Sequence, residues 1–166
     1  RIEIRMQDYR DIEGRYDKLV SIEMIEAVGR QYLRKFIKCC SDLLEPHGQM
    51  ALQAITIRDQ QYTKHIRTVD FIKRYIFPGG CLVGVTALCE AAMKVTDMQL
   101  VHMEDITSSY VQTLRLWREH FRARADQILE MGFSENFLRL WEYYLSYCEG
   151  SFNERYIGDV QMVFAK

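Results

Sequence analysis

The residues of this chain best suited to chemistry are carboxylates at the ends of apolar strings. Glu23 and Glu26 lie three residues apart in SIEMIEAVG, and Asp8 follows the alternating string IEIRMQ. Burying a carboxylate is costly unless it is hydrogen-bonded, so we expect at least one of the two glutamates to face a polar cleft. The alternative for the glutamates is an acidic helix start favoured by the helix dipole. The alternative for Asp8 is a turn-forming or helix-capping carboxylate.

Two further polar side chains lie among apolar neighbours. Gln53 interrupts the apolar string ALQAITI and must find hydrogen-bond partners if it is buried, in the core or in a site. Tyr110 precedes Trp117 on one face of an expected long helix, where packing with a bonded hydroxyl is the default. The apolar faces of this helix and the next are expected to form core, although they could also wall an acyl-chain tunnel. Arginines at 115, 118 and 122 indicate a solvated helix face, with anionic lipid headgroups as the alternative contact.

The sequence contains no pattern typical of a disulfide framework, a metal site or a phosphate-binding loop. The five cysteines are odd in number and form no CxxC pair, which favours a reducing cytoplasm over a disulfide framework. The four histidines form no HxxxH or HExxH pair, so we expect no metal site. The chain contains no GxSxG, Walker or GxGxxG motif, and nothing in it is therefore expected to cradle a phosphate.

Composition limits the class of protein. The 166 residues carry 22 Lys and Arg against 23 Asp and Glu, and 48% are hydrophobic. This composition predicts one globular domain with a core of its own, and the lack of a basic excess argues against a nucleic-acid partner. No run reaches the roughly 18 apolar residues of a membrane span, and the first ten residues do not resemble a signal peptide.

The hydrophobic periodicity changes several times along the chain, and the alternation sets the fold class. Period-two or continuous apolar strings predict strands at 2–6, 16–22, 49–57, 98–106 and 158–165. Helical spacing predicts helices at 30–44, 70–77, 85–94 and 108–130, and one more capped by Ser134. The fold class is therefore α/β, with three layers and helical crossovers between the first, parallel strands. Ligands bind beyond the carboxyl ends of such strands, where Gln7, Asp8, residues 21–26 and residues 55–56 would gather.

Several strings, in fixed order, resemble the cyclopropane-fatty-acyl-phospholipid synthase family of S-adenosylmethionine-dependent methyltransferases. They are QDYRDIEGRYDKLVSIEMIEAVG (7–29), LEPHGQMALQAITI (44–57), VDFIKRYIFPGGCL (69–82), SYVQTLRLWREHF (109–121) and NFLRLWEYYLSYCEGSFNERYIGDVQMVF (136–164). The resemblance covers nearly the whole chain.

The resemblance implies a function and a fold. The function is methyl transfer from S-adenosylmethionine to the cis double bond of an unsaturated phospholipid acyl chain, with a bound bicarbonate accepting a proton as the ring closes. The fold is the three-layer, Rossmann-like class I methyltransferase sheet of order 3-2-1-4-5-7-6, with helices on both faces. The five expected strands would be its third to seventh. Residues 1–166 would then be a partial domain that lacks the first two strands, and we expect it to be inactive on its own.

The resemblance also assigns residues. Gln7 and Asp8 match the pair that flanks the adenine, and Ile22 matches a position whose backbone meets the cofactor. Glu26 and Tyr110 match side chains that bind bicarbonate, as do the backbone of Ile55 and, in place of a frequent histidine, Gln53. An amide there can donate a hydrogen bond but cannot carry a charge.

The resemblance further implies a cytoplasmic enzyme, peripheral to the inner face of the membrane, acting on phospholipid acyl chains. Two alternatives stay open, namely a relative that adds an unclosed methyl branch and a non-catalytic module that binds lipid or protein. Without the first two strands, Leu19 to Ile22 would form an exposed apolar edge. We therefore expect residues 2–6 to be displaced or disordered, or to pair with a second copy in a dimer.

Overall fold

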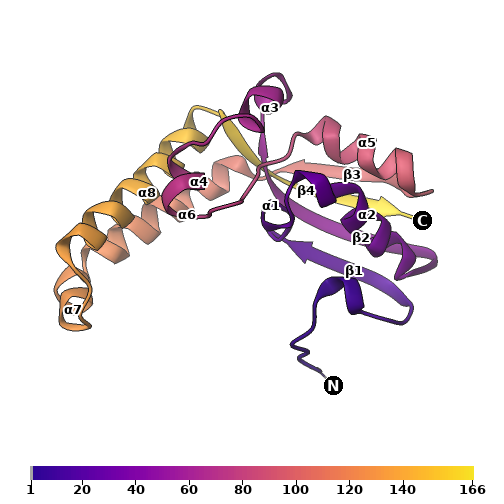
Figure 1. Cartoon of the computed structure of the whole chain (residues 1–166), viewed down its shortest axis with the longest axis horizontal. Coiled ribbons are helices and arrows are strands. Elements are labelled where there is room, and N and C mark those ends of the chain that lie inside the picture. The colour runs from indigo at the N-terminus through magenta and orange to yellow at the C-terminus, as the bar shows by residue number, and fades with distance from the viewer. Residues whose placement is uncertain (1) are drawn as a thin grey trace.

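The computed structural model describes residues 2–166. A four-stranded mixed sheet in the order β1-β2-β4-β3 forms its centre (Figure 1). The strands are β1 (Tyr16–Ile22), β2 (Leu44–Ile57), β3 (Gln99–Asp105) and β4 (Ile157–Ala165). β1 runs parallel to β2, whereas β4 is antiparallel to both β2 and β3. The last strand of the chain is therefore inserted, reversed, between two strands of the opposite direction.

The helices fall into three groups along the chain. Short helices follow the N-terminal segment and β1, namely η1 (Tyr9–Asp11), α1 (Ile25–Val28) and η2 (Arg30–Tyr32). Crossover segments hold α2 (Leu33–Asp42), α3 (Asp59–His65), α4 (Phe71–Tyr75) and α5 (Val85–Val95). The third group is α6 (Thr107–Arg122), α7 (Ala125–Glu130) and α8 (Glu135–Asn153), which extend from the sheet as a helical arm (Figure 1).

Two apolar clusters pack against the two faces of the sheet. On one face, Met50 and Leu52 of β2 and Phe164 of β4 pack in one core with α2 and α5. Strand side chains alternate between faces, so Gln53 and Ile55 of β2 lie on the other face. There Ile55 packs against the second cluster, which is formed by α6 and α8 around Leu114, Leu145 and Phe152. The arm thus packs on the second face at the end of β2 and the start of β4, where Ile55 and Ile157 contact it.

The strand expected at 2–6 is not formed. Residues 2–8 have no regular structure, and Ile2, Ile4 and Met6 are exposed. A period-two pattern supplies a strand face but no partner, and an unpaired strand leaves its backbone groups to water. The sheet begins instead at β1, whose outer edge is free in the described part of the chain, with Val20 66% and Ile22 63% exposed.

Three element boundaries differ from the expectations. The helix expected at 30–44 divides into η2 and α2 and ends at Asp42, and Pro46 to Gly48 lie inside β2, where the register with β1 shifts. A bulge tolerates a proline in a strand and explains the left-handed φ of +69° at His47. The helix expected at 108–130 is divided into α6 and α7. Ser134 caps α8 as expected, because its hydroxyl accepts a hydrogen bond from the backbone N–H of Phe137.

Candidate functional site

Three carboxylates meet where β1 and β2 end and β4 begins. Glu23 directly follows β1, Glu26 lies in α1, and Asp159 lies near the start of β4. We call these three residues the acidic cluster. The antiparallel register of β4 places Asp159 opposite Ile55 near the end of β2, so residues more than a hundred positions apart face one space. Within residues 2–166, none of the three takes part in an ion pair.

Gln53 connects two members of the acidic cluster. Its side-chain Nε2 donates to Glu23 Oε1 at 2.8 Å and to Asp159 Oδ2 at 2.9 Å. Its Oε1 accepts a hydrogen bond from Nε2 of Gln161 at 2.9 Å. Both ends of the amide are therefore engaged, and the amide orientation follows from its partners. The partners that Gln53 was expected to need are site residues rather than core groups.

Glu23 reaches the site from a left-handed backbone. Its φ is +50°, a conformation that favours glycine, and its backbone N–H continues the β1–β2 ladder to the carbonyl of Gln53. Its second oxygen, Oε2, accepts a hydrogen bond from the hydroxyl of Tyr110 at 2.9 Å. Both oxygens of Glu23 are therefore hydrogen-bonded, one by Gln53 and one by Tyr110.

Glu26 faces the same space from α1. Its Oε1 accepts a hydrogen bond from the backbone N–H of Ile55 at 2.6 Å, whereas its Oε2 is buried without a partner. Burial raises the pKa of Glu26, and the nearby Glu23 charge raises it further. Glu26 therefore lies in the first turn of α1, as the helix-start alternative expected, while its carboxylate contacts the end of β2 beside Glu23.

Asp159 is the most buried member of the cluster. It is 0% exposed, and its Oδ1 has no hydrogen-bond partner. Burial first, and then the charge of Glu23, raise the pKa of Asp159 to about 7. Near neutral pH this carboxyl therefore divides between its protonated and ionised forms.

Two tyrosines border the acidic cluster. Burial and the hydrogen bond to Glu23 both raise the pKa of Tyr110. Burial is also the main cause that raises the pKa of Tyr144 to about 12, with a contribution from the Glu23 charge. Both hydroxyls therefore keep their protons at neutral pH. Tyr110 also packs on Phe152 and Trp117, so it has both the packing role expected by default and a polar role in the site.

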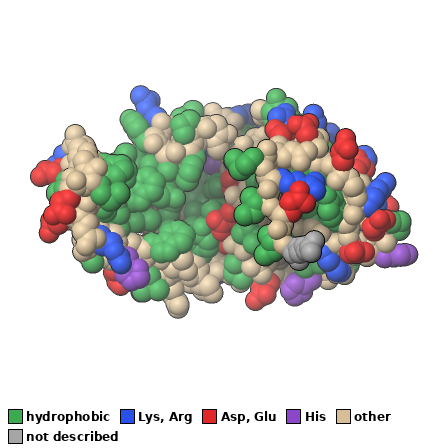
Figure 2. Space-filling model, turned by 90° about the horizontal axis from the view of Figure 1, so that it is seen from below, with side chains coloured by type: hydrophobic (Ala, Val, Ile, Leu, Met, Phe, Trp, Pro, Cys, Tyr) green, Lys and Arg blue, Asp and Glu red, His purple; other side chains and the backbone are tan. Residues whose placement is uncertain are grey.

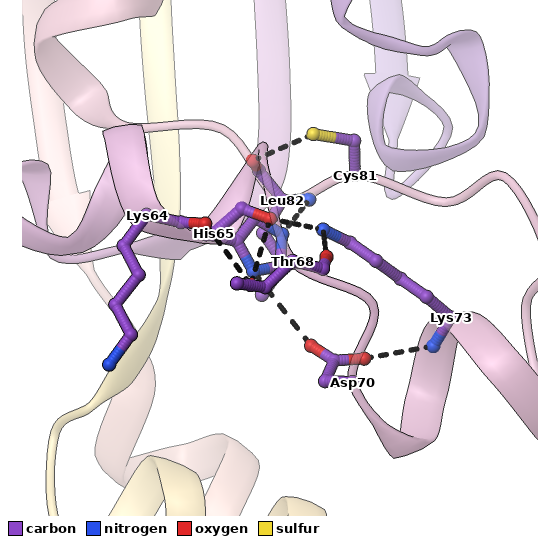
Figure 3. Close-up of polar contacts among 7 residues, drawn as sticks. All are labelled: Lys64, His65, Thr68, Asp70, Lys73, Cys81 and Leu82. Carbon is purple, nitrogen blue, oxygen red and sulfur yellow. Dashed lines mark hydrogen bonds and ion pairs between the residues drawn. The ribbon is translucent and has the colours of Figure 1, made fainter.

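The loop around Cys81, which follows α4, is hydrogen-bonded to α1 and to the end of β2. The backbone N–H of Cys81 donates to the carbonyl of Glu26 at 2.9 Å, and Ile57 donates to the carbonyl of Val83 at 3.0 Å. Nε2 of His65 accepts the backbone N–H of Leu82 at 3.1 Å (Figure 3). The segment from Cys81 to Val83 thus links α1, which carries Glu26, to the end of β2.

Within the same close-up, His65 is held on both sides (Figure 3). Its Nδ1 lies 3.8 Å from Oδ2 of Asp70, and Asp70 Oδ1 accepts the backbone N–H of Lys73 at 2.9 Å. Burial lowers the pKa of His65, as does the nearby Lys73 charge. A neutral imidazole is what the hydrogen bond from Leu82 requires, because a protonated Nε2 could not accept it.

An apolar groove leads along the helical arm. Figure 2 shows hydrophobic side chains gathered over the arm, up to a hollow where acidic side chains appear. The groove has a volume of about 440 Å³ and is lined mainly by aromatic and aliphatic side chains, Trp117, His120, Phe121, Arg124, Gln127, Ile128, Met131, Trp141, Tyr144 and Leu145. Tyr144 belongs to this lining and also lies near Glu23, so the groove and the acidic cluster adjoin. Among the described residues, no helix is long and apolar enough to cross a bilayer.

The arginines of α6 are paired within the protein. Arg115 and Arg118 both contact Glu149 of α8, and Arg122 contacts Glu142. These ion pairs join the two helices of the arm, which agrees with the expected solvated helix face more than with a headgroup site.

The three residues expected at the cofactor lie outside the acidic cluster. Asp8 caps η1 by accepting the backbone N–H of Arg10 and pairs with its guanidinium, and Gln7 donates to the carbonyl of Asp11. Ile22 ends β1 next to Glu23 and is largely exposed. The structure thus gives Asp8 the capping role that the sequence left open, and leaves its cofactor role a prediction. The other four expected residues, Glu26, Gln53, Ile55 and Tyr110, come together around Glu23.

Asp159 was not expected as a site residue, and it is the group that sequence reasoning missed. In the string IGDVQMVF it precedes an apolar strand. The rule that singled out Glu23 and Glu26, a carboxylate bordering a buried strand, applies to it equally. In a parallel sheet only the carboxyl ends of strands meet at the site, however, and a reversed strand brings its start to that edge.

The fold and the site together define the class of protein. A parallel pair followed by a reversed strand between β2 and β3 is the second half of the class I methyltransferase sheet, in its expected order 4-5-7-6. The mycolic acid cyclopropane synthase CmaA1, in complex with SAH and CTAB, matches with a TM-score of 0.85 at 25% sequence identity, over 95% of this chain and 58% of that one. The cyclopropane synthase MmaA2 from Mycobacterium tuberculosis matches with a TM-score of 0.84 at 25% identity, also over 95% and 58%.

The chain belongs to the mycolic acid cyclopropane synthetase family, whose model matches residues 1–162. It is therefore part of a family of S-adenosylmethionine-dependent methyltransferases that includes fatty-acid methyltransferases. The tuberculostearic acid methyltransferase UfaA1 of Mycobacterium tuberculosis is 40% identical over 95% of this chain and 37% of its own length. The cyclopropane-fatty-acyl-phospholipid synthase of Escherichia coli (strain K12) is 32% identical over 99% of this chain and 41% of its own length. The chain spans about two fifths of these curated relatives.

The charges of the site fit S-adenosylmethionine better than bicarbonate. A sulfonium is a cation, and the acidic cluster offers carboxylates without a basic partner in the described residues. The donors assigned to bicarbonate are engaged by these carboxylates, Ile55 N–H by Glu26 and the Tyr110 hydroxyl by Glu23. The buried Oε2 of Glu26 has no partner, however, and could accept a hydrogen bond from the hydroxyl of a bicarbonate ion. The bicarbonate that the resemblance implies therefore stays a prediction.

Proposed function

We propose that the chain is the acyl-binding and proton-handling part of a fatty-acyl phospholipid methyltransferase, and that the whole enzyme is a cyclopropane synthase. The observation that carries this proposal is the acidic cluster at the strand ends beside an apolar groove. When bound, S-adenosylmethionine supplies an electrophilic methyl group to the cis double bond. The acidic cluster must then stabilise positive charge on the acyl chain, and the groove must bind the apolar part of that chain.

The acidic cluster matches the charge of that path. Methyl transfer to an alkene leaves positive charge on the acyl chain, in a place where water must be excluded. Carboxylates fixed by the fold stabilise such a charge most strongly in a site of low dielectric constant. Gln53 and the backbone of Ile55 hold Glu23 and Glu26 in place, so the carboxylates need not reorganise as the charge develops.

The groove matches the apolar substrate. Its lining is mainly aromatic and aliphatic, and it adjoins the acidic cluster at Tyr144. An acyl chain lying along α6 and α8 would bury apolar surface there, at roughly 0.8 kcal/mol for each methylene group. Its double bond would then lie near Tyr110 and the acidic cluster. We assign the cofactor to the edge beyond β1, near Ile22, with Gln7 and Asp8 toward its adenine.

The test supplies the intact enzyme with S-adenosylmethionine labelled in its methyl carbon and with vesicles of an unsaturated phospholipid. We expect the label in the acyl chains, as one added carbon per altered double bond. Fully saturated vesicles serve as the control and should stay unlabelled. Label in neither lipid, with S-adenosylmethionine bound, would contradict the proposal.

A methyl-branching activity is the second candidate. Two observations favour it, the 40% identity to a tuberculostearic acid methyltransferase and the uncharged Gln53 at the position where the family often has histidine. Proton NMR of the labelled product separates the two outcomes, because cyclopropane ring protons and a methyl branch have different signals.

A further inference from the structure

The short helix α4 and the chain around it expose apolar side chains. Val69 precedes α4, Tyr75 ends it and Phe77 follows it, and each of the three is more than half exposed. Tyr143 of α8, also more than half exposed, lies beside α4, because Phe71 packs edge-on against it with 4.7 Å between ring centroids. Exposed apolar side chains that gather in one place, rather than singly, mark a site of interaction.

The same segment is basic. Residues 64–77 hold four Lys and Arg against one acidic residue, Asp70, in a chain whose net charge is −1. Asp70 Oδ1 accepts the backbone N–H of Lys73, and Lys73 Nζ donates to two backbone carbonyls, so both side chains are engaged within the segment (Figure 3). Arg67 and Arg74 are exposed, and neither takes part in an ion pair within the described part of the chain. Their positive charge is therefore available to a partner.

The exposed apolar and basic side chains around α4 form one surface that borders the groove. The guanidinium of Arg74 lies 5.5 Å from the ring centroid of Tyr75, so cation and aromatic ring are adjacent. Phe77 packs edge-on against Tyr144 with 6.2 Å between ring centroids, and Tyr144 lines the apolar groove. α4 also lies beside α8 in Figure 1. We call this set of residues the α4 surface: Arg67, Val69, Arg74, Tyr75, Phe77 and Tyr143.

We propose that the α4 surface docks the enzyme on an anionic phospholipid bilayer. This inference rests on the proposed function and deepens it, because it names the surface at which the bilayer presents an acyl chain to the groove. Aromatic rings beside arginines suit the bilayer interface, since the rings bury apolar area at the headgroup boundary while each cation is attracted to anionic lipid. An acyl chain leaving the bilayer passes Phe77 and enters the groove at Tyr144 with little exposure to water.

The charge of the α4 surface favours a bilayer over a second copy of the chain. A twofold contact through this surface would bring the same patch of both copies together, and with it Arg67 and Arg74 of each copy. The surface itself contains no acidic side chain to offset that repulsion. The arginines of α6, which the sequence offered as a headgroup contact, are instead paired with Glu149 and Glu142.

The first arm of the test is sedimentation of the intact enzyme with vesicles of fully saturated phosphatidylcholine, with and without fully saturated phosphatidylglycerol. No double bond is present, so this binding does not depend on the reaction. We expect phosphatidylglycerol to strengthen binding, and NaCl raised from about 50 mM to about 500 mM to weaken it. Arg67→Gln with Arg74→Gln should weaken the affinity by about 10- to 30-fold through loss of two attracted charges. Tyr75→Ser with Phe77→Ser should weaken it by about tenfold and leave its salt dependence unchanged.

Two matched variants control for charge and for folding. Arg34→Gln with Lys35→Gln removes two exposed charges from α2, which packs on the other face of the sheet, and should bind within about twofold of wild type. Arg67→Lys with Arg74→Lys keeps the charge of the α4 surface and should also bind within about twofold of wild type. Loss of binding in this lysine variant would contradict attraction by charge.

The second arm measures methyl transfer to vesicles of unsaturated phosphatidylglycerol. We expect Arg67→Gln with Arg74→Gln to raise the apparent KM for the vesicles by about tenfold and to leave kcat within about twofold, because the α4 surface touches no reacting atom. Glu90→Gln, at an exposed carboxylate on α5, should leave both quantities unchanged.

The outcomes of the two arms separate this inference from the proposed function. Binding that ignores phosphatidylglycerol, or equal binding by the wild type and the glutamine variant, overturns the α4 surface as a bilayer contact. Self-association of the wild type that the glutamine variant abolishes, without vesicle binding, would give the surface to a second copy and overturn it too. Vesicle binding as expected in an enzyme that transfers no methyl group would contradict the proposed function alone.

Discussion

Asp8 has a visible structural role and an expected functional one. It is an exposed cap of η1, and its hydrogen bonds to Arg10 hold its pKa well below the usual range. The family resemblance places it at the adenine instead. Because a cap needs only a short oxygen acceptor, asparagine can replace aspartate there. The two roles can therefore be separated by substitution.

We expect Asp8→Ala to weaken S-adenosylmethionine binding to the intact enzyme by about tenfold, through loss of a polar partner of the cofactor. Asp8→Asn should keep η1 and recover part of the affinity. Isothermal titration calorimetry measures both. Equal affinities in wild type and Asp8→Ala would mean that Asp8 serves the turn alone.

At the scale of elements, the loop around Cys81 depends on an uncharged His65. Nε2 of His65 accepts the backbone N–H of Leu82, and burial lowers the pKa of His65 in the folded protein. The unfolded chain therefore binds the proton at a higher pH than the folded protein does. The free energy of unfolding is then highest above about pH 6.5 and falls as the pH drops toward the lower, folded pKa.

We expect the wild type to lose about 1–2 kcal/mol of unfolding free energy from this group between about pH 8 and about pH 5. His65→Gln offers a similar acceptor without titration, so its pH dependence should be flatter than that of the wild type. Urea denaturation at the two pH values measures the difference between the two proteins. Parallel pH dependences would show that His65 does not couple the loop to folding.

The helices and strands that carry their own local signal could be predicted from the sequence. β1, β4, α5 and the Ser134 cap of α8 follow from period-two strings, helical spacing and capping chemistry. The short helix α3 has no comparable pattern, since its sequence DQQYTKH is polar throughout. Its position depends on contacts such as that of His65 with Leu82, which lie 17 residues apart.

The candidate site was predictable only in part for a related reason. Glu26, Gln53 and Tyr110 are visible as polar residues beside apolar strings, and the resemblance named them. The contact between Glu23 and Asp159 through Gln53 requires the reversed direction of β4, which no local pattern shows. The strand expected at 2–6 does not form, for the opposite reason. Its alternating pattern is local, but none of the described strands pairs with it.

At the scale of the whole molecule, the sheet has an apolar edge at β1. Val20 and Ile22 are exposed on this strand, and no neighbouring strand covers them within residues 2–166. The segment before η1 lies away from the sheet (Figure 1), as expected if residues 2–6 are displaced. Edges of this kind recruit strands from other chains.

We expect the 166-residue chain to self-associate in solution, and Val20→Lys with Ile22→Lys to shift it toward the monomer. Multi-angle light scattering over a concentration series measures the mass. Val69→Lys removes an equally exposed apolar side chain outside the strands and is the control. A stable monomer at all concentrations in the wild type would show that the edge is not a pairing surface.

The central claim is that the acidic cluster with Tyr110 is the place of reaction. The most direct measurement is single-turnover kinetics of the intact enzyme, with S-adenosylmethionine affinity measured in parallel, for Glu26→Gln and Tyr110→Phe. We predict that each substitution lowers the rate by about 100-fold, with the dissociation constant within about twofold of wild type, because these groups handle charge and protons rather than hold the cofactor. Glu90→Gln should match the wild type in both quantities. Rates within twofold of wild type in both Glu26→Gln and Tyr110→Phe would contradict the claim.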